Sequence, residues 1–397
     1  MSKGAIDREL IYLDHAATTP MRPEAIAAMQ PFLADVYANP SGSHRFAREA
    51  RRAIDEARDA VAAVVGCKPG EVIFNGGGTE GDNTAIFGAV RRIQATGGAA
   101  AAVCSAAEHH AVLHCVEHLT PHGAGVVVGT NGEGSIDVAA LADVLRRLSA
   151  EGTVPVVSVM AVNNEVGSIT RLDEVARVVR SAAPAAILHT DAVQAACWLD
   201  LAPITACVDI LSLSSHKFGG PKGCGIMFER VGVDIEPLIF GGGQERDRRS
   251  GTHNVAGIVA TAAALVATAA ERATETARIA ELRGELIAGL VAIGGVRATI
   301  AAEHSVPGIA HICIEGIENE ALLFLLDEAG LCASAASACA SGAMEPSHVL
   351  AAMGVPRELA RGALRLSLGH TTTRSDVSSA IGIIGTAVNR LRTHTRA

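Results

Sequence analysis

Short apolar runs alternate with helical patterns through the first two thirds of this 397-residue sequence. The runs read EVIFN at 71–75, VPVVSVMAV at 154–162, AAILHTD at 185–191 and VDILSLSS at 208–215. Each is short and apolar, and stretches with helical spacing separate them. Strands that alternate with helices in this way predict a mostly parallel sheet covered by helices, which is the α/β class.

The pattern changes at an alanine-rich stretch that covers residues 255–270. This stretch carries no charge, but it is too short and too rich in alanine for a membrane span. It continues into ERATETARIAELRGELIAGL, where apolar and charged positions recur at helical spacing. We therefore expect one long, half-buried helix that joins two domains. Beyond it, HICIEGI and ALRLSL predict strands of a smaller α+β domain.

Composition excludes several classes of protein. Hydrophobic residues make up 49% of the chain and charged residues 19%, which indicates a folded protein. A net charge of −9 and a pI of 5.9 provide no basic surface for nucleic acid or for an anionic membrane. Nine scattered cysteines without a CxxC pair favour reduced thiols in a cytoplasm. The start, MSKGAIDRELIYLDH, has charges where a signal peptide needs an apolar run.

Three polar segments lie where strands are predicted to end. NGGGTEGDN at 75–83 joins a strand to a helix, and its glycines and the helix N-terminus favour a phosphate group. LHTDAVQ places His189 and Asp191 on one strand face, at the edge where open α/β sheets bind ligands. LSSHKFGGPKG holds Lys217 directly after a strand. Each segment alone also fits a plain surface turn.

A histidine stripe is the main competing feature, because His110, His114 and His118 recur every fourth residue. Zinc accepts such ligands, but an HExxH glutamate and clustered cysteines are missing. We therefore expect a solvated helix face and no metal.

Two features near the C-terminus add to the polar segments. CASAASACASGAMEPSHVL at 332–350 places Cys332 and Cys339 among small residues. This pattern is typical of an accessible loop with a reactive thiol. The alternative is that both cysteines are small apolar side chains that fill space in an alanine-rich protein. In ALRLSLGH, Arg365 lies on the strand face opposite a leucine stripe. Its planar guanidinium can bind both oxygens of a carboxylate at once. A phosphate loop, a strand-end aspartate, a loop lysine, a cysteine and an arginine together indicate pyridoxal phosphate chemistry.

The ordered motifs resemble those of cysteine desulfurases, pyridoxal-phosphate enzymes of fold type I in the class V aminotransferase family, close to the nitrogenase-associated and housekeeping iron–sulfur members. The match runs from YLDHAATTP at 12–20 to RLSLGHTTT at 365–373. It includes ANPSGSHRF, GGTEGDN, AEHHAV, VNNEVG, HTDAVQA, SSHKFGGPKG, GGGQERDRRSGTHN and SACASGAMEPSHVL. The resemblance implies a large domain at 14–260 with a mostly parallel, seven-stranded-type sheet. It also implies a small α+β domain, formed by 1–13 and 261–397, that carries the active-site cysteine loop.

The resemblance further implies pyridoxal 5'-phosphate as the cofactor. Lys217 would bind it as a Schiff base, and Asp191 would pair with its pyridinium nitrogen. His109 would stack on the ring and assist proton transfer. The other implied contacts are Gly78, Thr79, Ser214 and His216 at the phosphate, Asn164 and Gln194 at the ring oxygen, and Thr252 at the phosphate of the neighbouring subunit, which implies a homodimer.

The implied reaction converts L-cysteine to L-alanine. Arg365, with Asn164, would hold the substrate carboxylate, and Lys217 would remove the α-proton. The Cys339 thiolate would attack the substrate sulfur and retain it as a persulfide. The sulfur would pass to an iron–sulfur scaffold or another acceptor protein for cluster assembly, with nitrogenase maturation in nitrogen fixation as one such use.

The sequence departs from the family pattern in several places. Ala335 and Ala336 stand where a serine–glycine pair is common, which should stiffen the cysteine loop. The sequence ends with NRLRTHTRA and shows little of the tail that housekeeping members extend toward their scaffold, so the sulfur acceptor stays open. The remaining departures are Asn75, Gly76, Gly81 and Gly219.

Two other functions fit part of the pattern. An aminotransferase of the same fold, or a selenocysteine lyase, would keep the cofactor; an aminotransferase would leave Cys339 without a role. The cysteine loop matches the desulfurase pattern at the same length, which favours the desulfurase. A non-catalytic metal- or sulfur-binding protein would use the histidine stripe and the free thiols, and it would purify without colour.

Overall fold

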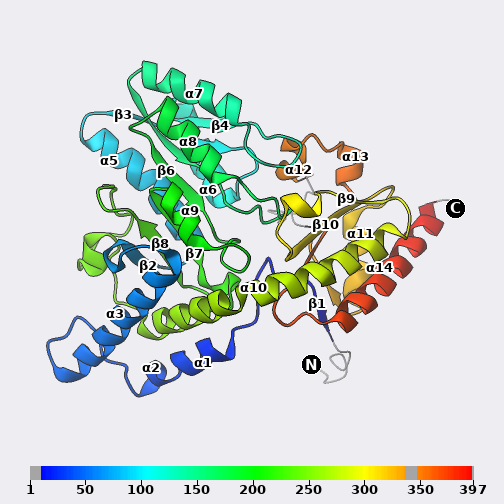
Figure 1. The fold of residues 1–397 in the computed structure, drawn as a ribbon, viewed down its shortest axis with the longest axis horizontal. Coiled ribbons are helices and arrows are strands. Elements are labelled where there is room, and N and C mark those ends of the chain that lie inside the picture. Colours follow the sequence, from blue (N-terminus) through cyan, green and yellow to red (C-terminus); the bar gives the residue numbers. More distant parts are fainter. Residues whose placement is uncertain (1–9, 336–346, 396–397) are drawn as a thin grey trace.

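The computed structural model describes residues 10–335 and 347–395, which form two units joined by one long helix (Figure 1). The larger unit contains a seven-stranded sheet with the order β2-β8-β7-β6-β5-β3-β4. Its strands are β2 (Val72–Asn75), β3 (Ala99–Ser105), β4 (Gly125–Val128), β5 (Thr153–Ser158), β6 (Ile187–Asp191), β7 (Ile210–Ser214) and β8 (Gly225–Glu229). β8 runs antiparallel to both neighbours, and the pairings among β3 to β7 are parallel. The predicted mostly parallel sheet is confirmed.

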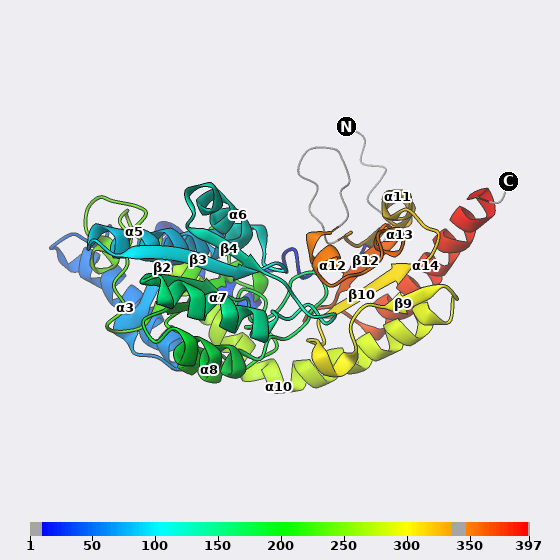
Figure 2. The ribbon, with the colours of Figure 1, turned by 90° about the horizontal axis from the view of Figure 1, so that it is seen from above.

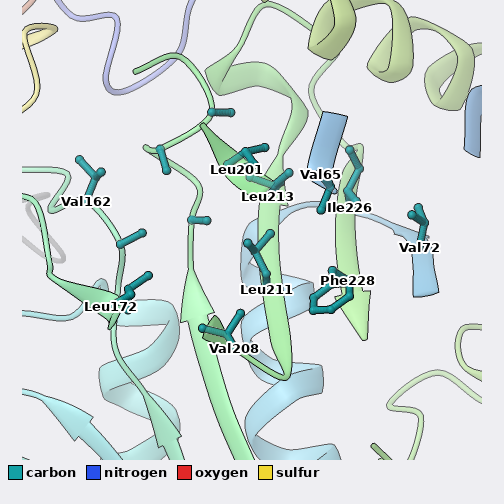
Figure 3. Close-up of a cluster of buried hydrophobic side chains, with 14 of the residues drawn as sticks. Val65, Val72, Val162, Leu172, Leu201, Val208, Leu211, Leu213, Ile226 and Phe228 are labelled. Atoms are coloured by element: carbon teal, nitrogen blue, oxygen red, sulfur yellow. The ribbon is translucent and has the colours of Figure 1, made fainter. Parts of the chain in front are cut away.

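Helices cover both faces of this sheet. Successive strand residues point to opposite faces, and apolar side chains on each face pack against helices. Leu211 and Leu213 pack into the core on one face, which Figure 3 shows, whereas Ile210 packs into the core on the other. The first core receives side chains from α3 (Arg45–Val65), α7 (Val138–Ala150), α8 (Leu172–Ala182) and α9 (Leu201–Cys207). The second core receives side chains from α5 (Ala89–Ala95) and α6 (His110–Leu119).

The helix α10 (Val255–Val291) extends from the larger unit to the smaller one (Figure 2). It begins where the Asn254 side chain accepts the N–H of Gly257 at 3.0 Å, a typical N-cap. Leu265 packs into the core of the larger unit, and Leu282 and Leu286 pack into that of the smaller one. α10 is long and apolar enough for a membrane span, but 56% of its most apolar window is buried inside the structure. The predicted joining helix is therefore present.

The smaller unit is built on a three-stranded antiparallel sheet with the order β12-β10-β9. Its elements are β9 (Val296–Ala298), β10 (Ile309–Ile314), α11 (Asn319–Glu328), β11 (Leu331–Cys332), α12 (His348–Ala352), α13 (Arg357–Ala360), β12 (Ala363–Ser367) and α14 (Arg374–Thr395). The N-terminal strand β1 (Ile11–Tyr12) pairs in parallel with β11. From there the chain enters the larger unit through α1 (Pro23–Met29) and α2 (Pro31–Ala34). Residues just after β1 therefore lie at the junction of the two units.

Two local differences separate the structure from the sequence prediction. The strand expected at 154–162 ends at Ser158, because the N–H of Met160 donates to the buried carboxylate of Glu108 at 2.9 Å. The helix expected after the glycine loop begins at Gly78 with α4 (Gly78–Asn83) and includes a π-helical turn at Thr84–Gly88 before α5.

A buried ion pair fixes the loop that contains Glu245. This carboxylate accepts both ends of the Arg58 guanidinium, at 2.6 and 2.9 Å, and the N–H of Phe74 at 2.9 Å. Burial alone raises the pKa of Glu245, but hydrogen bonds from His253 and Arg58 lower it to about 2. Glu245 and the next two residues have φ angles of 48°, 59° and 66°, a costly left-handed run. The ion pair therefore holds a strained loop against β2.

We predict that Arg58→Met lowers the free energy of unfolding by about 3–5 kcal/mol, because it leaves the Glu245 carboxylate buried without its partner. Urea denaturation measures this change. The matched control is Arg92→Met, which breaks the exposed pair with Asp234 and should cost less than about 1 kcal/mol. A cost for Arg58→Met as small as that of the control would contradict the prediction.

The same pair predicts a pH dependence of stability. The folded pKa of Glu245 is depressed to about 2, so its contribution is complete above the unfolded pKa of about 4.3. The contribution disappears as the pH falls through that range. Unfolding curves between about pH 5 and pH 2 should therefore show a larger loss of stability for the natural sequence than for Arg58→Met.

Candidate active site

One cavity of about 390 Å³ lies at the carboxyl ends of β5, β6 and β7. Parallel sheets bind ligands at this edge because their loops and helix N-termini converge there. The structure brings together ten of the residues named from the sequence in the lining of this cavity: Gly78, Thr79, His109, Asn164, Asp191, Gln194, Ser214, His216, Lys217 and Arg365.

Lys217 enters the cavity from the turn that follows β7. Its Nζ donates to the carbonyl oxygens of Ala16 at 2.6 Å and Ala17 at 2.9 Å. Burial lowers the pKa of Lys217 to about 8, and the Arg365 guanidinium adds to this effect. The amine is therefore easier to deprotonate than an ordinary lysine, as a nucleophile or a base requires. By contrast, Lys222 in the same loop is exposed.

Asp191 is the last residue of β6, and its side chain is almost fully buried. One carboxylate oxygen accepts the N–H of Val193 at 2.9 Å. Burial raises the pKa of Asp191 to about 6, although the Val193 hydrogen bond and Lys217 oppose the shift. Such a carboxylate gains from a cationic partner in the cavity, because a positive charge compensates for the lost hydration.

His189 shares the strand face of Asp191 but lies deeper. Its ring is fully buried between the hydroxyl groups of Ser158, at 2.8 Å, and Ser212, at 3.0 Å. Burial lowers the pKa of His189 to about 3, so the ring is neutral at pH 7. A second carboxylate, that of Asp82, lies 3.5 Å from the His189 ring and also lines the cavity. Sequence reasoning missed Asp82 because it looked like an ordinary residue of the glycine loop.

The other end of the cavity is formed by the glycine loop and the start of α4. Gly77 has a φ of 142°, which favours glycine, and its N–H donates to the Asn75 side chain at 3.0 Å. A Cβ atom at Gly78 would lie 2.6 Å from Val193, so a larger residue does not fit there. His216, opposite this loop, contacts the Thr18 hydroxyl at 3.1 Å. Backbone N–H groups at this helix start and the Ser214 hydroxyl provide donors for an anionic group.

His109 caps the N-terminus of α6. Its Nδ1 accepts the N–H of Ala111 at 3.1 Å, so in the neutral ring the proton resides on Nε2. Burial, together with Lys217, lowers the pKa of His109 to about 4. The next histidines along α6 stack on each other, with ring centroids of His110 and His114 4.7 Å apart. In residues 10–335 and 347–395, no three His, Cys, Asp or Glu side chains are grouped as a metal site.

Arg365 lies on β12 and reaches the cavity from the smaller unit. Its Nη1 donates to the backbone oxygen of Asn164 at 2.9 Å, and its Nη2 donates to the carboxylate of Asp14 at 2.8 Å. Leu364 and Leu366, on the opposite strand face, pack into the small core as the alternation predicts. The contact with Asp14 was not anticipated, because 351 residues separate the two positions.

One residue predicted to contact the cofactor does not line this cavity. Thr252 lines a separate cavity of about 190 Å³ beside Asn75 and Arg249. Cys339 lies outside the described residues, as does Ala336. Cys332 is half-buried on β11, and burial raises its pKa, which disfavours the reactive thiolate.

The described residues on either side of segment 336–346 are held close to the cavity. On the N-terminal side, Ser334 lines the cavity and exchanges backbone hydrogen bonds with Arg365, at 2.8 and 3.2 Å. On the C-terminal side, the Ser347 hydroxyl donates to the buried carboxylate of Glu165. The adjacent His348 contacts the backbone oxygen of Glu108 at 2.9 Å.

The donor set of this cavity fits pyridoxal phosphate. It offers a lysine amine with a lowered pKa, a buried carboxylate for a cationic ring nitrogen and N–H donors at a glycine loop for a phosphate. These groups lie on different strands and loops around one cavity. The residues present could therefore hold this cofactor.

Comparison with known proteins leads to the same chemistry. The aminotransferase class-V family matches residues 11–379. An IscS-like cysteine desulfurase of Mycobacterium tuberculosis is 43% identical, over 96% of this chain and 97% of the relative. A solved NifS-like protein aligns with a TM-score of 0.88 and 33% identity, over 96% of this chain and all of the other. A structure of SspA in complex with cysteine aligns with a TM-score of 0.76 and 29% identity, over 90% and 98% of the two chains. The chain therefore belongs to the class-V aminotransferase family and, within it, to the pyridoxal-phosphate-dependent cysteine desulfurases.

Proposed function

We propose that this enzyme converts L-cysteine to L-alanine and transfers the sulfur to its own Cys339 as a persulfide. One observation carries the proposal: a single cavity joins Lys217, Asp191 and Arg365 to Ser334, which lies close before the segment that contains Cys339. The first three groups suit an amino acid and a pyridoxal cofactor, and the segment supplies the thiol.

Ten residues would hold the cofactor and the substrate in this cavity. Lys217 would carry the cofactor, Asp191 would keep its ring nitrogen protonated, and His109 would lie against its ring. Arg365 would bind the substrate carboxylate. The remaining contacts would come from Gly78, Thr79, Ser214 and His216 at the phosphate, and from Asn164 and Gln194 at the ring oxygen. When bound, pyridoxal phosphate supplies an electron sink for the charge that develops at the substrate α-carbon.

Proton transfer would depend on two groups with lowered pKa values. The Lys217 amine would take the α-proton through Nζ, because its pKa of about 8 leaves a useful fraction neutral near pH 7. The neutral His109 ring carries its proton on Nε2 and would offer that N–H as a hydrogen-bond donor next to the reacting atoms. Both groups are buried, so bulk water does not compete strongly for these protons.

The sulfur step would be a nucleophilic attack by the Cys339 thiolate. A sulfur–sulfur bond forms between Cys339 and the substrate, and the substrate carbon–sulfur bond breaks. Its electron pair passes to the carbon skeleton, which takes up a proton and leaves as alanine. The persulfide then holds sulfur at the zero-valent level for an acceptor.

The cellular role is a further part of the proposal. We infer that the enzyme acts in the cytoplasm and passes sulfur to an iron–sulfur scaffold or another acceptor protein, with nitrogenase maturation as one use. The names of its relatives, IscS-like and NifS-like, support a place among enzymes of that kind. An aminotransferase or selenocysteine lyase activity is the alternative to be tested.

We also propose that the enzyme is a homodimer in which Thr252 reaches the cofactor phosphate of the partner subunit. Within one chain, Thr252 lines a cavity other than the one with Lys217. Large apolar side chains are exposed on the same unit, as a subunit interface requires: Ile26, Leu33, Tyr37 and Phe240.

We predict that Lys217→Ala abolishes the visible absorption band of the purified protein, because Lys217 is the only lysine among the described residues that line the cavity. Sulfide release should fall at least about a hundredfold. The matched control is Lys222→Ala, which removes an exposed lysine from the same loop and should keep both the band and the activity. A visible band in Lys217→Ala equal to that of the natural protein would refute this role.

We predict that Cys339→Ala keeps the visible band but loses sulfide release from cysteine by at least about a hundredfold. The control, Cys332→Ala, removes a half-buried thiol with a raised pKa and should keep its activity. Sulfide release by Cys339→Ala at the rate of the natural enzyme would exclude Cys339 as the sulfur acceptor. Alanine formation from selenocysteine but not from cysteine would favour the lyase instead.

A mixed dimer tests the role of Thr252. Lys217→Ala and Thr252→Ala subunits, each inactive or impaired alone, should regain activity when they are co-expressed. The site of the Thr252→Ala subunit then contains its own Lys217 and Thr252 of the partner subunit. Activity no higher than that of the separate variants would show that Thr252 does not act across the interface.

A further inference from the structure

The carboxylate of Asp14 forms an ion pair with Arg365, the arginine that would bind the substrate carboxylate. Arg365 is 5% exposed, and its Nη2 lies 2.8 Å from the Asp14 carboxylate in an ion pair. A second N–H of the guanidinium is bound to the backbone oxygen of Asn164. A substrate carboxylate that binds Arg365 would therefore share this cation with Asp14.

Hydrogen bonds hold the backbone of Asp14 beside β12. Asp14 forms a bridge with Ser367 beside β12, and the Tyr12 hydroxyl donates to its backbone oxygen at 3.1 Å. The same oxygen accepts the N–H of Ala17 at 3.0 Å, in the turn whose carbonyl groups bind Lys217. The backbone of Asp14 is thus anchored within reach of Arg365.

The negative charge of Asp14 affects both Arg365 and Lys217. It is paired with Arg365, and it also acts to raise the pKa of Lys217, against the effect of burial. If a ligand carboxylate also pairs with Arg365, the negative charge of Asp14 loses part of its compensation beside a buried guanidinium. A ligand that also brings an ammonium group restores the balance, whereas a simple carboxylate does not.

We propose that Asp14 is a specificity-determining residue that makes the site select zwitterionic α-amino acids over carboxylates without an amino group. The pair Asp14–Arg365 presents one negative and one positive charge, which complement the two charges of the amino acid. Cellular monocarboxylates thereby gain little from the buried arginine. This inference rests on the proposed function, because it assumes that Arg365 receives the substrate carboxylate.

The test compares L-alanine with propionate, which have the same carbon skeleton and differ in the amino group. Titration calorimetry on the cofactor-loaded enzyme gives both dissociation constants without turnover. We expect Asp14→Asn to lower the ratio of the propionate constant to the alanine constant by about fivefold or more, the scale of a partly exposed charge pair. The change should come mainly from tighter propionate binding.

Three variants complete this test. Asp14→Glu keeps the charge and should keep the ratio within about twofold of the natural enzyme. Asp143→Asn removes an exposed carboxylate of α7 that pairs with Arg146, and should leave the ratio unchanged. Asp14→Ser also removes the charge, and it replaces Asp14→Asn if thermal unfolding shows that the asparagine variant is not folded.

The outcomes separate this inference from its alternatives. A purely structural role for Asp14 would weaken both ligands equally in Asp14→Asn, and an unchanged ratio would overturn the proposal. The binding ratio requires no sulfur chemistry, so it is independent of the proposed reaction. An enzyme that releases no sulfide from cysteine but shows the expected ratio would overturn the desulfurase function and leave the selectivity of Asp14 intact.

Discussion

The hydrogen bonds between Lys217 and the carbonyl oxygens of Ala16 and Ala17 organise the active site. They connect the end of β7 to the segment that enters the larger unit from β1. The amine is held in a buried position, where its charge is costly and its pKa falls to about 8. The reactivity of the lysine therefore depends on how the two units meet around the N-terminal segment.

Opposite charges around Lys217 make this burial tolerable. Asp191 and Asp14 favour the lysine cation, whereas burial and Arg365 oppose it. The Lys217 amine can therefore change its charge near neutral pH. The groups that act on it are the Asp191 carboxylate and the Asp14–Arg365 ion pair. A similar balance recurs at Glu245, where Arg58 compensates for a buried carboxylate and fixes a strained loop. Burial thus shapes both the chemistry and the stability of this fold.

Local patterns predicted the fold class, the glycine loop, Lys217, Asp191 and Arg365, whereas the family resemblance supplied the other predicted residues of the cavity lining. Lys217 and Asp191 each follow a strand run, and parallel strands bring their carboxyl ends to one edge. The pairing of Asp14 with Arg365 could not be predicted, because no periodicity relates residues from β-bridged segments 351 positions apart. The end of β5 at Ser158 was also not predicted, since it depends on the buried Glu108 of another loop. Contacts of this kind depend on the tertiary fold and not on local sequence patterns.

We propose above all that sulfur leaves cysteine in the cavity of Lys217 and is bound by Cys339. Mass spectrometry of the peptide that contains Cys339, after brief incubation of the enzyme with L-cysteine and trapping of persulfides, tests it most directly. We expect one added sulfur atom on Cys339 in the natural enzyme and none in Lys217→Ala. An unmodified Cys339 in an enzyme that is forming alanine from cysteine, or added sulfur on another cysteine alone, would contradict the account.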